Sequence, residues 1–214
     1  MNKSGDYHDY VFKNGKLVGD FEGMYRYSAV TPWHQDRTAN EWYTEIAIVM
    51  LKEKAPYNKI LEIGCGLGYF AKKLKRMGKD IDAFDISATA IKKAKTLHKG
   101  IHFYIDDITK KSFNPLRRYD LVVAKDIFWY VFPELEDVFA NIKKCIKPKK
   151  FLFVSQSFPA LNTNFVGKDI ISDPETLIDL LVKKIGIEPI NAIFVRRFMY
   201  KADGPTLHFL GLKI

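Results

Sequence analysis

Short apolar runs alternate with segments of helical spacing from residue 59 onward. The apolar runs predict strands at 59–64, 81–86, 101–107, 119–126 and 151–158. Between them apolar residues recur every three or four positions, as Phe70, Leu74 and Met77 do, which predicts amphipathic helices. Strands that alternate with such helices form βαβ units, so the pattern predicts an α/β fold with a doubly wound, mostly parallel sheet.

Residues typical of helix ends mark two of the predicted helices. Ser87 precedes the helix after the second strand as its N-cap, and Gly100 follows the end of that helix. Asp173 and Gly186 bracket a later helix in the same way. These segments therefore carry the start and stop signals of complete helices.

Both ends of the chain add elements to this repeat. Asn14-Gly15 lies between apolar flanks and predicts a tight hairpin, and residues 36–54 predict a helix that packs on the sheet. Segments 190–200 and 206–214 predict two late strands, antiparallel to each other at one edge. With these strands the expected sheet is Rossmann-like and seven-stranded.

Two segments lie outside the strand–helix repeat. We expect residues 1–35 to form an N-terminal arm or cap, and residues 36–214 to form the Rossmann-like domain, so that the chain is a single domain overall. Residues 158–173 form a loop that is long for a compact domain. Such loops are often lids or binding loops.

The net charge of the chain is +9. Its lysines are spread over several predicted helices, for example at Lys72, Lys92, Lys143 and Lys183, and form no single basic stripe. A solvated, lysine-rich surface explains this charge better than a nucleic acid partner does.

The sequence also bears on the cellular compartment in which the protein is expected. No apolar run approaches the ~20 residues of a membrane-spanning helix, and the opening MNKSGDYHDYVF lacks the apolar core of a signal peptide. Cys65 and Cys145 are the only cysteines, which is too few for a disulfide framework. We therefore expect a cytoplasmic protein without membrane contact.

Three glycines at alternate positions, Gly64, Gly66 and Gly68, follow the first strand of the repeat. A dinucleotide site has a further glycine where this chain has Tyr69, because that glycine packs the helix close to the pyrophosphate. The Lys-Ser/Thr pair of a phosphate-binding P-loop is also missing. The loop therefore favours a ligand without phosphates.

Polar residues end the next three strands. Asp85 ends the second strand, Asp107 follows the third, and Lys125-Asp126 ends the fourth. The carboxyl ends of parallel strands meet at one edge of the sheet, where doubly wound folds bind their ligands. A carboxylate at the position of Asp85 can accept hydrogen bonds from both hydroxyls of a ribose.

The segment LEIGCGLG at 61–68 resembles motif I of the class I S-adenosylmethionine-dependent methyltransferases. In it, Glu62 stands between two apolar residues, and three alternate glycines follow. The resemblance covers about residues 55–155 and implies S-adenosylmethionine as the cofactor; we expect no metal. It implies that Asp107 bonds the adenine amino group, that the Ile108 amide meets the ring, and that Lys125 and Asp126 lie beside the sulfonium. Glycines let the backbone approach the methionyl end, whose ammonium group Glu62 would attract.

Two segments resemble a narrower group, the NodS-like small-molecule methyltransferases. They are FEGMYRYSAVTPWHQ at 21–35 and KDIFWYVFPELEDVFANIKKCIKP at 125–148. This resemblance implies that Tyr25 and Trp33 close over the methionyl end of the cofactor. The chain departs from the group at Lys125-Asp126, where Ser-Glu is typical. The Pro-Trp-His-Gln variant and the DYHDY opening resemble methyltransferases that decorate bacterial surface saccharides.

The cofactor site expected from these patterns combines the glycine loop, the strand ends and the aromatic N-terminal segment. Side chains such as Ile86, Phe128 and Trp129 are candidates to flank the adenine or the sulfonium. The expected cofactor-binding residues are Tyr25, Trp33, Glu62, Gly64, Cys65, Gly66, Gly68, Asp85, Ile86, Asp107, Ile108, Lys125 and Phe128.

We therefore expect a methyltransferase that acts on a small molecule, which can be anionic. The leading interpretation is O-methylation of a saccharide, or of a phosphorylated precursor, used in surface polysaccharides. A hydroxyl acceptor needs a base, because its proton must leave as the new bond forms. His34 is the first candidate, since histidine titrates near neutral pH. Asp126 is the second candidate, or the group that orients the base, and His8 is the third.

Other functions remain open. N-methylation of an amino sugar or amine is the first alternative, and RNA methylation is the second. The sequence KDIFWY stands where enzymes that methylate base amino groups carry Asn/Asp-Pro-Pro-Tyr/Phe. The chain can also be a non-catalytic cofactor-binding protein, although such a protein need not keep the acidic series. A short-chain dehydrogenase is disfavoured by Tyr69 and by the absence of Tyr-x-x-x-Lys after the fifth strand.

Overall fold

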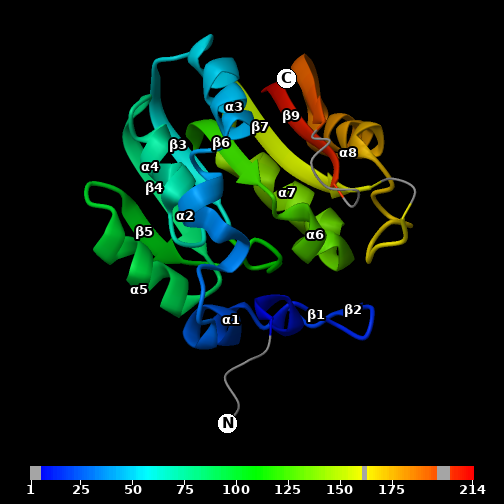
Figure 1. The fold of residues 1–214 in the computed structure, drawn as a ribbon. Helices are drawn as coiled ribbons and strands as arrows, with labels where there is room; N and C mark the ends of the chain where they lie inside the picture. The colour runs from blue at the N-terminus through cyan, green and yellow to red at the C-terminus, as the bar shows by residue number, and fades with distance from the viewer. Residues whose placement is uncertain (1–5, 161–162, 197–202) are drawn as a thin grey trace.

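A twisted sheet of seven strands forms the centre of the structure, a computed structural model that describes residues 6–160, 163–196 and 203–214 (Figure 1). The strand order across the sheet is β5-β4-β3-β6-β7-β9-β8. The strands are β3 (Tyr57–Ile63), β4 (Gly78–Asp85), β5 (His102–Ile105), β6 (Tyr119–Lys125), β7 (Ile146–Pro159), β8 (Ile187–Arg196) and β9 (Asp203–Lys213).

Parallel pairing links the first five strands of this order. The chain leaves β3 toward β4 on one side and later returns to β3 on the other side as β6, so the strand order reverses between β3 and β6. Ligands of such sheets bind in the crevice beyond the carboxyl ends of the strands at this reversal. The predicted doubly wound, mostly parallel, seven-stranded sheet is confirmed.

The two late strands pair with each other antiparallel, as predicted. Of these two late strands, only β8 lies at an edge of the sheet. Strand β9 is inserted between β7 and β8 and runs antiparallel to both. Residues 197–200 of the predicted strand 190–200 lie outside the described residues.

Helices cover both faces of the sheet (Figure 1). One core contains side chains of α3 (Trp42–Lys52), α4 (Tyr69–Leu74) and α5 (Ala88–Leu97). The opposite core contains side chains of α7 (Leu135–Cys145), α8 (Pro174–Leu180) and the π-helical turn η4 (Leu181–Gly186). Strand β3 contributes to both cores, with Ile60 on one face and Leu61 and Ile63 in the other core.

Local sequence signals explain most of the helix boundaries. Ser87 Oγ caps α5 by accepting from the Ala90 amide, and Asp173 caps α8 by accepting from the Thr176 amide, both as predicted. The helix predicted over 36–54 is interrupted, since α2 (Gln35–Thr38) ends before α3 begins.

The predicted helix that starts near Tyr69 is shorter than its apolar spacing indicates. It ends at Leu74, because Gly78 already pairs with Tyr57 at the start of β4 and the chain must turn back before it.

The N-terminal residues lie across the carboxyl end of the sheet as η1 (Tyr7–Tyr10), β1 (Phe12–Lys13), β2 (Lys16–Leu17), α1 (Phe21–Tyr27) and η2 (Pro32–His34) (Figure 1). The predicted hairpin turn is present, with Asn14 and Gly15 both at positive φ. A third apolar cluster packs these elements on the glycine loop and on α5, through Met24, Tyr25, Leu67 and Ala90.

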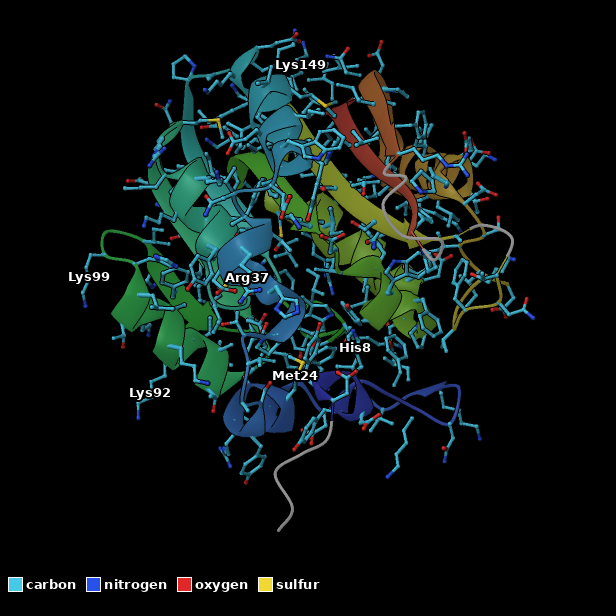
Figure 2. The ribbon with its side chains drawn as sticks, in the orientation of Figure 1. His8, Met24, Arg37, Lys92, Lys99 and Lys149 are labelled. Atoms are coloured by element: carbon cyan, nitrogen blue, oxygen red, sulfur yellow. The ribbon has the colours of Figure 1, made fainter. Side chains whose placement is uncertain are left out.

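Surface lysines are dispersed over the molecule. Figure 2 shows Lys92 and Lys99 pointing outward beside α5, while Lys149 lies at the opposite end of the molecule. Within the described ranges, no helix has the length and apolar character needed to cross a membrane.

Candidate active site

A cavity of about 980 Å³ lies at the carboxyl ends of the parallel strands, between the sheet and the N-terminal elements. Its lining comes from the ends of β3, β4 and β6, from the loop after β5, and from η1, α1 and η2. The sequence-predicted residues that line it are Tyr25, Trp33, His34, Glu62, Gly64, Cys65, Asp85, Ile86, Asp107, Ile108, Lys125 and Asp126. The structure thus gathers at one site residues that are up to 101 positions apart in the chain (Tyr25 to Asp126).

Three predicted residues do not line the cavity. Phe128 is fully buried and packs against Phe139, so it belongs to the core rather than to a ligand site, which corrects that prediction. Its neighbour Trp129 lines the cavity instead. Gly66 and Gly68 are buried beneath other side chains.

Gly64 and Gly66 both have positive φ, and neither position has room for a Cβ. Gly64 has φ +67°, and a Cβ there would meet Ile127 Cγ2 at 2.6 Å. Gly66 has φ +52°, and a Cβ there would meet the side chains of Gln35 and Tyr25 at 2.4 and 2.5 Å. Gly64 is partly exposed and lines the cavity, whereas Gly66 is buried beneath protein.

Asp85 is held rigidly at the end of β4. Its carboxylate accepts from the Gly66 amide at 2.8 Å and from the Ser87 amide at 2.9 Å, and its side chain lines the cavity. Burial raises the pKa of Asp85 to about 6, although the hydrogen bonds from these amides oppose the rise. Each oxygen keeps acceptor capacity for a ligand hydroxyl.

Glu62 lines the cavity from the end of β3 and is only 3% exposed. Its Oε2 atom has no hydrogen bond partner within the described part of the chain. Burial raises the pKa of Glu62 to about 8, and the positive charge of Lys125 limits the rise. A buried carboxylate oxygen that faces a cavity without a partner fits a ligand that brings a cation.

The loop after β5 contributes Asp106, Asp107 and Ile108 to the cavity. One oxygen of Asp107 accepts from the amide and the hydroxyl of Thr109 at 3.0 and 2.7 Å, while the other lies 3.6 Å from Lys110 Nζ. Asp107 is thus oriented by its own loop. Asp106 was not predicted, because the acidic residue expected after this strand was assigned to its neighbour Asp107.

Lys125 and Asp126 form an ion pair inside the cavity. The other Asp126 oxygen accepts from the Ser157 amide at 2.7 Å, which ties the end of β6 to β7. Burial alone would raise the pKa of Asp126, but the charge and hydrogen bond of Lys125 outweigh it and keep that pKa below its usual value. Asp126 is therefore a poor base at neutral pH, and its bonds hold Lys125 and β7 rather than His34.

His34 is exposed and lines the cavity, and although it occupies the N-cap position of α2, its side chain makes no capping hydrogen bond there. Trp33 and His34 have φ values of 51° and 47°, and Asp126 has 53°. Left-handed backbone costs a residue with a side chain about 1–3 kcal/mol, and such strain is concentrated at functional sites. The role of His34 as the base stays a prediction.

The two other histidines considered from the sequence differ in position. His8 lines the cavity from η1 and stacks on Tyr7. Figure 2 shows His8 in the N-terminal layer. His208 is fully buried in β9 and stacks on Phe153. Burial lowers the pKa of His208 to about 4, which fits the structural role expected from the sequence.

Aromatic rings form the N-terminal wall of the cavity. Trp33 lies 5.4 Å from Tyr130, 5.8 Å from Tyr7 and 6.4 Å from Phe21, measured between ring centroids. Tyr7, Phe21 and Tyr130 were not predicted, although the density of aromatic residues in both segments was a usable signal. This wall can stack on a flat or apolar ligand surface.

Across the ranges that the structure covers, no three or more His, Cys, Asp or Glu side chains are grouped so as to hold a metal ion. Cys65 and Cys145 are both buried and free.

Comparisons with known proteins agree with this geometry. Residues 60–149 match the family model described as "Methyltransferase domain". The chain is 29% identical over 112 residues to malonyl-[acyl-carrier protein] O-methyltransferase 2 of Ilyobacter polytropus, a match that covers 50% of this chain and 42% of that protein. It is 30% identical over 112 residues to the ubiquinone biosynthesis O-methyltransferase of Rhodopseudomonas palustris, over 50% of this chain and 41% of that protein. The matched region thus spans less than half the length of these relatives.

Among solved structures, the chain is similar to the N-methyltransferase NodS of Bradyrhizobium japonicum in complex with S-adenosyl-L-homocysteine. The TM-score is 0.67 at 21% identity, over 86% of this chain and 92% of NodS, which shows a shared fold. The sequence match to a methyltransferase domain thus covers residues 60–149, and the structural match shows the fold that the chain shares with NodS.

Proposed function

We propose that the chain transfers a methyl group from S-adenosylmethionine to a small molecule bound in the same cavity. The observation that carries the proposal is the convergence of Glu62, Asp85 and Asp107 on one cavity from three neighbouring strand ends. The matched methyltransferase domain spans all three residues.

The cavity residues fit this cofactor group by group. Asp85 would accept from the ribose hydroxyls, and Asp107 would bond the adenine amino group. The unpartnered Oε2 of Glu62 would face the ammonium group, and the backbone at Gly64, which lines the cavity, would lie along the methionyl chain. When bound, the cofactor supplies an electrophilic methyl group; the protein orients the acceptor toward it and excludes water.

For the acceptor, we propose a hydroxyl group of a saccharide. Trp33 and Tyr130 offer aromatic faces on which a sugar ring can stack, and His34, which also lines the cavity, would take the hydroxyl proton. The O-methyltransferase names of the curated relatives support oxygen as the receiving atom. The use of the product in surface polysaccharides rests only on the resemblance of the N-terminal segment.

The charge of the cavity favours a second candidate, an amine acceptor such as an amino sugar. Carboxylates outnumber lysines in the lining, and Lys125 is already paired with Asp126. The lining carboxylates are Glu62, Asp85, Asp106, Asp107, Asp126 and Glu134. A phosphorylated acceptor would therefore meet repulsion, whereas a neutral or cationic acceptor would not.

We also propose that residues 1–35 act as the cap of the domain 36–214, because η1, α1 and η2 supply part of the cavity wall. Location in the cytoplasm and the absence of a nucleic acid partner stay predictions.

The test is release of S-adenosylhomocysteine from S-adenosylmethionine in the presence of separate acceptor classes. Glucose-type saccharides, glucosamine, sugar phosphates and total RNA are the probes. The proposal predicts turnover with a neutral saccharide and none with RNA. Methylation of RNA, or tight cofactor binding without turnover of any probe, would count against it.

A further inference from the structure

Four consecutive amides of the glycine loop each have an acceptor, but the acceptors come from different places. The Cys65 amide donates to Phe84 O and the Gly68 amide to Cys65 O, both within the sheet and loop. The Gly66 amide donates to Asp85. The Leu67 amide donates to Gln35 Oε1 at 2.9 Å, so the N-terminal region supplies one of the bonds that shape the loop.

Gln35 uses its other end to hold α1. Its Nε2 donates to the Tyr25 hydroxyl at 3.1 Å, and both groups lie directly over Gly66. Tyr25 is buried, and its backbone carbonyl accepts from Lys93 Nζ at 2.6 Å. The carboxamide of Gln35 therefore fills the space between α1 and the glycine loop.

Glu22 ties the other end of α1 to the loop after β4. Its carboxylate accepts from the Ser87 hydroxyl at 2.7 Å, the Thr89 amide at 3.0 Å and the Thr89 hydroxyl at 2.7 Å. Ser87 in turn donates its amide to Asp85. Glu22 and Tyr25 lie one turn apart on α1, so a single short helix is fixed to both loops that meet at Asp85.

These bonds form a closed ring from α1 through Ser87, Asp85, the glycine loop and Gln35 back to α1. We propose that Gln35 is a positioning residue for the cofactor site, which sets the glycine loop through the Leu67 amide. The inference rests on the proposed function, because the loop it positions is the one assigned to the cofactor. Docking of the N-terminal cap is thereby part of the cofactor site.

The ring has a consequence for the ligand. A loop whose amide has lost its acceptor samples more conformations, so a cofactor that needs one of them binds less tightly. Gln35 itself also lines the cavity. Removal of its carboxamide should therefore weaken cofactor binding and, in the ligand-free protein, speed hydrogen exchange at the Leu67 amide.

The experiment uses the full chain with Gln35→Leu, which keeps the size of the side chain and removes both hydrogen bonds. Amide hydrogen exchange of the ligand-free protein should show Leu67 exchanging at least ten times faster than in the wild type. Titration calorimetry should show at least tenfold weaker affinity for S-adenosylhomocysteine. Gln35→Glu keeps an acceptor for the Leu67 amide and should restore slow exchange. Val30→Ala, at an exposed position of the cap away from the loop, should change neither readout.

Wild-type exchange at Leu67 in Gln35→Leu would overturn the inference. Should Gln35→Leu fail to fold, Tyr25→Phe removes only the hydroxyl at the other end of the carboxamide and should also speed exchange at Leu67; an unchanged rate there would overturn the inference as well. The exchange readout needs no ligand. A wild type that binds no S-adenosylhomocysteine would therefore contradict the proposed function, while fast exchange at Leu67 in the variant would still uphold the positioning role.

Discussion

The carboxylate of Asp85 accepts a hydrogen bond from the Gly66 amide at 2.8 Å, which fastens the end of β4 to the glycine loop after β3. Its second oxygen accepts from the Ser87 amide, so both oxygens are fixed before any ligand arrives. A carboxylate held in this way can meet a ribose with little loss of side-chain entropy. Asp85 is therefore held by backbone amides rather than by other charged side chains.

Replacement of Asp85 by Asn should weaken binding of S-adenosylhomocysteine by an order of magnitude or more. The new amide group would point a donor at either the Gly66 or the Ser87 amide, and one of these buried donors would lose its acceptor. Titration calorimetry measures the effect. Asp80→Asn is the control, since Asp80 is exposed at the opposite end of β4, and unchanged affinity in Asp85→Asn would remove that residue from the cofactor site.

Glu62 should make the ligand-free protein less stable as pH rises from 6.5 to 8.5. Its pKa is raised to about 8 in the folded protein, so the unfolded chain loses this proton at lower pH than the folded chain does. The free energy of unfolding therefore falls across this window. Asp85, with a pKa of about 6, and His208, with a pKa of about 4, change stability mainly at lower pH.

Urea unfolding at several pH values measures this slope, and Glu62→Gln should flatten it. An identical slope in the wild type and in Glu62→Gln would show that the buried carboxyl does not titrate as described.

His34→Ala should reduce turnover of a hydroxyl acceptor by ~10²-fold or more if His34 removes the proton. Affinity for S-adenosylhomocysteine should stay the same, because the imidazole is assigned to the acceptor. His8→Ala is the matched variant, since His8 also lines the cavity. A decrease of less than fivefold in His34→Ala, with a large one in His8→Ala, would transfer the role of base to His8.

Glu22→Ala should lower the free energy of unfolding by ~1–3 kcal/mol, because three donors on Ser87 and Thr89 lose their acceptor. Hydrogen bonds from Thr89 and Ser87 lower the pKa of Glu22 to about 2, so its contribution is complete above pH 4.5 and is lost as pH falls toward 2. Thermal unfolding at pH 7 and pH 3 measures both effects.

Arg26→Ala removes the exposed ion pair of Glu22 but leaves its bonds to Ser87 and Thr89, and it should destabilise the protein less than Glu22→Ala does. An equal loss in Arg26→Ala and Glu22→Ala would contradict the importance of the bonds to α5.

The fold could be predicted because its signals are local. The element order could be predicted from the alternation of strand and helix spacing and from caps such as Ser87 and Asp173. Parallel strands bring their carboxyl ends to the same edge of the sheet. Asp85 and Asp107 could therefore be assigned to one cavity from their positions alone. The insertion of β9 between β7 and β8 could not be predicted, because the order of antiparallel strands depends on pairing across the sheet.

Other site residues depend on partners distant in sequence. Gln35 is notable only beside Leu67, and Tyr130 only beside Trp33, which are contacts that no local pattern encodes. The error at Phe128 has a different source. Helix α6 (Phe128–Val131) is so short that the direction in which the chain enters it decides which of its side chains face the core. The left-handed backbone of Asp126, at φ 53°, sets this direction.

The most direct test of the central claim is a crystal structure of the full chain with S-adenosylhomocysteine. The account predicts one ligand in the cavity, with its ribose on Asp85, its adenine on Asp107 and Ile108, and its ammonium group facing Glu62. A ligand bound elsewhere, or a ribose that does not contact Asp85, would contradict it.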